Sequence, residues 1–198
     1  MFLFTGCVGR TADALYALPK QPEEYYELQN AIDRVLVQDA SYMLIVPHEC
    51  PDTPAMRRMP LIMYNEDSFD NPPFRADIVV DIDDEIHTKL RAASLNVSQV
   101  YEWLPYTHEE TVPEDADARF AWLKGMEITP ETTDAEVLAE SRGYAVRYAR
   151  PAARFRQQLI ETYGQEKGSK IRYAEAFEVC PYGRQLTDAV KQELFPFI

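Results

Sequence analysis

The sequence is poor in histidine and has no long apolar run. Its three histidines, His48, His87 and His108, do not stand at the spacing of metal ligands. His87 is expected on an exposed helix face and His108 in a solvated acidic loop. No apolar stretch approaches the ~20 residues that cross a bilayer. The sequence therefore predicts neither a histidine metal centre nor a membrane span.

Cysteine is also scarce. Cys7, Cys50 and Cys180 are odd in number, lie far apart and include no Cys-x-x-Cys. This pattern predicts free thiols in a reducing compartment, so a cytoplasmic location is expected. The opening MFLFTGC places Cys7 after a short apolar stretch, but a basic segment is missing and the stretch is shorter than a signal peptide needs. His48 and Cys50 alone are too few ligands for a metal site.

Positively charged residues are also fewer than negatively charged ones. The 198 residues carry a formal net charge of −13, which disfavours nucleic acid and anionic membranes as partners. A hydrophobic content of 46% is ordinary for a globular protein, and the length fits one domain. We expect residues 1–35 to form an atypical N-terminal segment and residues 36–198 to form the domain.

Apolar periodicity predicts the main elements. The β-branched run at residues 78–80 is typical of a strand covered on both faces, and the following helix is expected to end at Pro105. Pro151 should kink or divide a long helix over 134–163. Strands separated by helices indicate an α/β fold with a mainly parallel sheet. The expected helices cover 28–44, 86–104, 118–126, 134–163 and a final turn, and the expected strands cover 61–64, 78–80 and 171–179.

Two clusters of charge have ordinary explanations. Asp81 or Asp83 can cap the helix that follows, with Asp84 and Glu85 near its positive end, so a metal cluster is the weaker interpretation. The arginines between 142 and 156 are expected to form a solvated face, one of them pairing with an acid at a strand end. A phosphate site there is the minority interpretation.

Several blocks resemble the bacterial branch of the PIG-L (LmbE-like) family of zinc-dependent N-acetylglucosaminyl deacetylases. The resemblance covers residues 36–198 and implies a Rossmann-like layered fold that lacks its first strand–helix unit. No single block is a catalytic signature, and the likeness depends on their order and number. The blocks are LVQDASYMLIVPHECPDTP (36–54), PFRADIVVDID (73–83), Lys89 with Ser98-Gln99, VYEWLPY (100–106), YGQEKGSKIRYAEAFEVCPYGRQ (163–185) and the final LFPF.

In that family, His-Pro-Asp-Asp and a second motif containing Asp-His hold zinc and supply a general base, the set that water activation requires. This chain contains no His-Pro-Asp-Asp, and residues 27–34 (ELQNAIDR) contain no histidine. A third family histidine corresponds to Asn96, which cannot shuttle a proton. We therefore expect no metal site, no cofactor and no catalysis from this chain, although zinc serves the family.

The resemblance also suggests a remnant of a sugar pocket. Glu175 and Phe177 would lie near its rim, although a bond from Glu175 to Arg172 or Arg184 is an equally good structural explanation. Polar groups at strand ends are further candidates, because ligands of α/β folds bind there. The candidate pocket residues are Tyr64, Asp67, Asn96, Gln99, Glu175 and Phe177.

Three functions remain open from the sequence. The first is the family's zinc-dependent deacetylation of an N-acetylglucosamine-type substrate, with ligands supplied upstream of Met1. The second is a non-catalytic module that binds a small sugar-type ligand or a protein. The third is an unstable fragment with an exposed sheet edge. The substitution at Asn96 favours the second.

Overall fold

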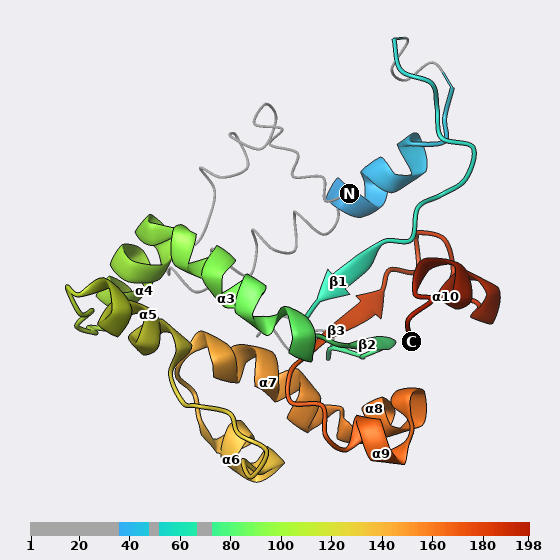
Figure 1. Ribbon diagram of the computed structural model, residues 1–198. Coiled ribbons are helices and arrows are strands. Elements are labelled where there is room, and N and C mark those ends of the chain that lie inside the picture. The colour runs from blue at the N-terminus through green and yellow to red at the C-terminus, as the bar shows by residue number, and fades with distance from the viewer. Residues whose placement is uncertain (1–35, 48–51, 67–72) are drawn as a thin grey trace. The chain divides into compact units, whose positions relative to one another are not determined.

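The computed structural model describes residues 36–47, 52–66 and 73–198 (Figure 1). The chain divides into two compact units, Met1–Ile62 with Pro181–Arg184 and Met63–Cys180 with Gln185–Ile198. In the first unit residues 36–43 are helical, which confirms that part of the helix expected over 28–44. The Arg184 N–H donates to the Pro60 carbonyl at 2.9 Å and joins the two segments of this unit.

The second unit is a mixed α/β structure, as the sequence predicts. No helix of the described residues has the length and apolarity that a membrane crossing requires. Its elements are β1 (Met63–Asn65), β2 (Ile78–Asp81), η1 (Asp83–Glu85), α3 (Ile86–Leu95), η2 (Ser98–Trp103), α4 (Leu104–Thr107), α5 (Ala116–Lys124), α6 (Asp134–Ala139), α7 (Tyr144–Arg154), α8 (Arg156–Tyr163), α9 (Gln165–Gly168), β3 (Ala174–Val179) and α10 (Asp188–Leu194).

The strands of the described chain form one sheet in the order β1-β3-β2, and both pairings are antiparallel. The expected parallel pairing is therefore not the one found in the described sheet. Asp81 at the end of β2 faces Ala174 at the start of β3, so the chain leaves and re-enters the sheet at the same end. A buried β-branched run specifies that both faces are covered, but it does not specify the direction of the neighbouring strand.

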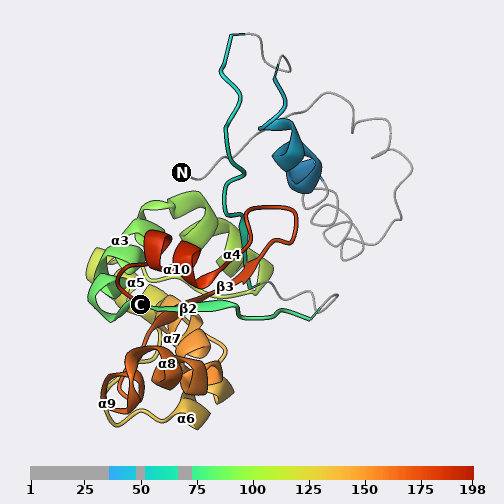
Figure 2. The same ribbon diagram turned by 90° about the vertical axis from the view of Figure 1, so that its right-hand side faces the viewer.

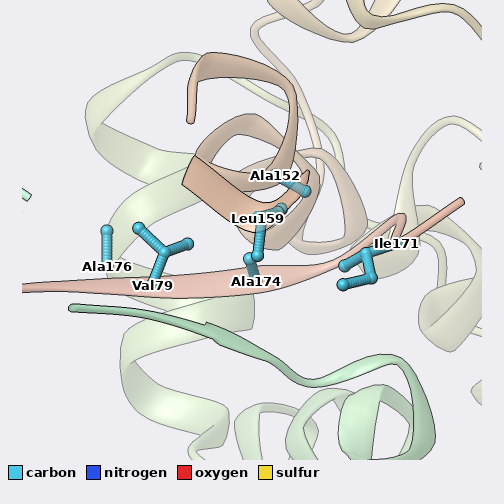
Figure 3. Packing of buried hydrophobic residues seen from close by; sticks show 6 residues of the cluster. All are labelled: Val79, Ala152, Leu159, Ile171, Ala174 and Ala176. Atoms are coloured by element: carbon cyan, nitrogen blue, oxygen red, sulfur yellow. The ribbon is translucent and has the colours of Figure 1, made fainter. Parts of the chain in front are cut away.

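The core beside this sheet lies between strands β2 and β3 and helices α7 and α8. Figure 3 shows its six buried side chains together, with Leu159 from α8 close to Ala174 of β3. Leu159, Ala152 and Ala174 have no exposed surface, and Val79 and Ile171 are almost as buried. Small residues on the strand and on α7 let helix and sheet approach closely. A second view places α7 and α8 beside β2 (Figure 2).

The helix expected to run from residue 86 to 104 is broken earlier. Helix α3 ends at Leu95, and Asn96 leaves helical geometry with ψ of 67°. A π-helix, η2, then leads into α4, where Pro105 occupies the first turn instead of ending the helix. Proline is tolerated there because the first helical N–H groups need no intrahelical acceptor.

The long helical pattern over 134–163 forms three helices. A Thr133–Glu136 capping box starts α6, and Gly143, with φ of 89°, separates it from α7. Helix α7 continues past Pro151 to Arg154, and Phe155, which is not helical, separates it from α8. The predicted division of the long pattern is confirmed, but it does not occur at Pro151, which lies inside α7.

Candidate functional site

Glu175 and Phe177 project from the same side of strand β3, because they alternate with buried Ala174 and Ala176. The Glu175 carboxylate is half-buried and accepts a hydrogen bond from Lys89 Nζ at 2.6 Å. The same ammonium lies 5.0 Å from the centre of the Tyr148 ring. The partner of Glu175 is thus Lys89 of α3, not Arg172 or Arg184. This ion pair joins α3 to the sheet.

The other predicted pocket residues lie elsewhere. Asn96 and Gln99 are exposed, at the end of α3 and in η2. Tyr64 of β1 donates its hydroxyl to the sulfur of buried Cys180 at 2.9 Å. Asp67 lies outside the described residues, as do His48, Cys7 and Cys50. The expected sugar pocket is therefore not assembled by the described members of this set.

A cavity of about 590 Å³ lies instead at the end of the sheet where β2 ends and β3 begins. Its volume is similar to that of small-molecule sites, but it is largely open to solvent. Strand β2, the end of α8, helix α9 and the segment before β3 form its walls. We call it the β2-end cavity, and its lining residues are Asp81, Asp83, Tyr163, Gly164, Gln165, Glu166, Lys167, Lys170 and Ile171.

Asp81 anchors one wall of the β2-end cavity. Its carboxylate pairs with Lys167 Nζ at 2.9 Å and accepts the Asp83 N–H at 3.0 Å. Its own N–H donates to the Tyr163 hydroxyl at 3.1 Å, so the phenol proton can still be donated to a ligand. Burial raises the pKa of Tyr163, which keeps that proton in place. The hydrogen bond to Asp81 raises the pKa of Lys167, which therefore stays charged.

Of the two predicted caps, Asp81 accepts the N–H of Asp83, the first residue of η1, whereas Asp83 has a different role. The Asp83 carboxylate reaches across to the segment before β3. Its Oδ1 accepts the N–H groups of Tyr173 at 2.7 Å and Arg172 at 3.0 Å. Burial raises the pKa of Asp83, with a further contribution from the charge of Asp81, while these backbone donors oppose the shift. Asp83 thus fixes the entry to β3 beside the exit of β2.

Arg156 stabilises the segment from α9 to β3 that forms one wall of the cavity. Its guanidinium forms two hydrogen bonds to Asp134, at 2.7 and 3.0 Å. It also donates to the carbonyls of Gly168 at 2.9 Å and Ile171 at 2.5 Å. Arg154, by contrast, pairs with Glu66 just after β1, which confirms the prediction that one arginine pairs with a strand-end acid. Arg156 was expected on the solvated face, but it links α6, α8 and α9.

Replacing Arg156 with lysine is expected to lower the free energy of unfolding by about 2 kcal/mol, because an ammonium cannot reproduce the planar two-bond contact with Asp134. Chemical denaturation of both proteins measures the difference. Lys170→Arg makes the reverse exchange, lysine to arginine, at an exposed position and serves as the control. A loss no larger than that of the control would contradict the proposed role of Arg156.

The described residues do not fit a resident zinc ion. Within 36–47, 52–66 and 73–198, no three side chains of His, Cys, Asp or Glu are placed to hold one metal. His87 and His108 are exposed, and the His108 ring bonds the Leu104 carbonyl of its own helix.

Comparison of the chain with family models, with curated proteins and with solved structures finds no match.

The sequence indicates only part of the β2-end cavity. It places Asp81 and Asp83 at a strand end, where the local pattern predicts helix capping. Tyr163 and Lys167 belong to the YGQEKG block, and no pattern in the sequence marks them as site residues. The useful signal is Gly164, whose φ of 83° turns the chain between α8 and α9 and brings this block next to Asp81.

Proposed function

We propose that this chain is a non-catalytic relative of the PIG-L deacetylases that binds a small sugar-type ligand in the β2-end cavity. The main support for the proposal is the make-up of that cavity, which is lined by three carboxylates together with a phenol hydroxyl, an amide and two ammonium groups. A sugar hydroxyl both donates and accepts hydrogen bonds, so it needs carboxylate acceptors and N–H or O–H donors side by side.

The exposure of several lining groups supports this ligand class. Lys170 is 73% exposed, and its ammonium pairs with Glu166 at 3.4 Å, a surface pair that contributes little to stability. Gln165 is exposed as well. These side chains can therefore turn toward a ligand without loss of a strong internal contact.

The relationship to the PIG-L family is part of the proposal and rests on the sequence blocks between residues 36 and 198. It includes the Rossmann-like ancestry of the scaffold. The absence of catalysis is proposed because Asn96 occupies the position of a family histidine, and an amide cannot carry a proton near neutral pH. Asn96 is exposed at the end of α3.

The binding proposal is tested by titrating isotope-labelled protein with glucose and with N-acetylglucosamine and recording amide chemical shifts. We expect saturable shifts at residues 81–83 and 163–171. Lys170→Gln should weaken binding about 3- to 10-fold, the equivalent of one hydrogen bond, without loss of fold. Lys191→Gln, on α10, is the matched control and should bind as the parent does. Absence of shifts at these residues with both sugars would refute the proposal.

A zinc-dependent deacetylase is the second candidate, favoured by the same sequence blocks. Residues 1–35 and His48 lie outside the described chain, so the test must use the whole protein. Metal analysis after purification with zinc, followed by an assay for acetate released from N-acetylglucosamine derivatives, distinguishes the two. One equivalent of bound zinc together with acetate release would replace the binding proposal by the enzyme.

A further inference from the structure

The charges of the β2-end cavity point to a more specific ligand. On the basis of the proposed sugar binding, we propose that the cavity prefers a polyhydroxylated ligand that carries a protonated amine, such as an amino sugar. Its walls contain the carboxylates of Asp81, Asp83 and Glu166 and the ammonium groups of Lys167 and Lys170. One negative charge is therefore left without an equal positive charge.

The unbalanced charge can be assigned to Asp83. Asp81 pairs with Lys167 at 2.9 Å and Glu166 pairs with Lys170 at 3.4 Å. Across the described chain, none of the ion pairs within 4 Å includes Asp83. Its hydrogen-bond donors are backbone N–H groups, which carry only partial charge, and the positive charge of Arg172 acts on it from beyond 4 Å. A ligand ammonium would supply the missing cation.

The Asp83 carboxylate has an oxygen suited to this contact. Its Oδ1 takes the two short backbone bonds, at 2.7 and 3.0 Å, while Oδ2 has one longer bond of 3.2 Å to the Arg172 N–H. A carboxylate oxygen accepts two hydrogen bonds, so Oδ2 retains capacity for a donor. The group is half-buried, which strengthens a charge-assisted bond relative to one in open water. Tyr163 and Lys170 remain as partners for hydroxyl groups.

The test compares glucosamine, glucose and glucuronic acid by the same chemical-shift titration at neutral pH. We expect glucosamine to bind about tenfold more tightly than glucose, and glucuronic acid to bind more weakly than glucose. Added sodium chloride should weaken the binding of glucosamine and leave that of glucose almost unchanged.

Asp83→Asn is the informative variant, because its side-chain carbonyl can replace Oδ1 and keep both short backbone bonds. It should reduce the ratio of glucosamine affinity to glucose affinity to about one, whatever its effect on glucose binding itself, and Asp188→Asn, on α10, should leave that ratio at the parent value. Equal affinity of the parent protein for glucosamine and glucose would overturn the preference and leave sugar binding intact. Failure of all three ligands to bind would refute sugar binding itself. Should Asp83→Asn fail to fold, salt dependence identical for glucosamine and glucose would overturn the preference.

Discussion

Replacing Leu159 with alanine is expected to lower the free energy of unfolding by about 4 kcal/mol. Leu159 has no exposed surface and packs with Val79, Ala152 and Ala174 between α8 and the sheet (Figure 3). Truncation of a buried leucine costs 2–5 kcal/mol, the sum of lost apolar transfer and the cavity left behind. The upper part of that range applies where neighbours cannot collapse into the space, and here the neighbouring alanines have no side-chain freedom to do so.

Leu95→Ala is the matched control for this substitution. Leu95 also lies on a helix, but it is 82% exposed, so its truncation should change stability by less than about 0.5 kcal/mol. Urea unfolding followed by circular dichroism measures both variants. Equal losses for Leu159→Ala and Leu95→Ala would show that α8 does not pack on the sheet as described.

The consequence for the β2-end cavity follows from the position of Leu159. Tyr163 lies one helical turn further along α8 and accepts the Asp81 N–H, so α8 holds one wall against the end of β2. Leu159→Ala protein that remains folded should therefore bind sugar more weakly, although Leu159 does not line the cavity. The loss should be the same for glucose and glucosamine, because Asp83 is unchanged.

Much of the secondary structure could be predicted from residue patterns. The β-branched run at 78–80, the helical periodicity near Trp122 and the alternation in β3 all correspond to elements of the structure. These signals are local, since each reflects which side chains of one segment are buried. Strand direction is not local. The antiparallel pairing depends on how the helices between β2 and β3 return the chain to the sheet. The residues of the two strands do not specify this connection.

The candidate site was harder to predict for a related reason. An aspartate at a strand end and before a helix has two roles with the same local pattern, capping and contact to a distant segment. Asp83 contacts residues 172 and 173, about ninety positions away, and only the folded chain makes that contact visible. Glu175 was similarly ambiguous, and its partner Lys89 lies 86 positions earlier. Pairings at such separations leave no periodic signal in one sequence.

Replacing Gly143 with alanine is expected to lower the free energy of unfolding by about 4 kcal/mol. Gly143 has φ of 89° and ψ of 148°, a region that is open almost only to glycine and costs other residues about 1–3 kcal/mol. A Cβ there would lie 2.6 Å from the Gly125 Cα and closer still to the Lys124 carbonyl oxygen. Both neighbours are backbone atoms, so relief requires α5 and α7 to move apart, which adds about 1–3 kcal/mol.

Gly164→Ala separates these two contributions. Gly164 has a similar backbone, with φ of 83° and ψ of 159°, but an added Cβ would meet nothing within 4 Å. Its substitution should therefore cost the conformational strain alone, about 2 kcal/mol. Denaturant unfolding of the two variants gives the cost of the close approach as their difference. Equal losses would mean that α5 and α7 are not in backbone contact at Gly125 and Gly143, and that only the conformation of each glycine matters.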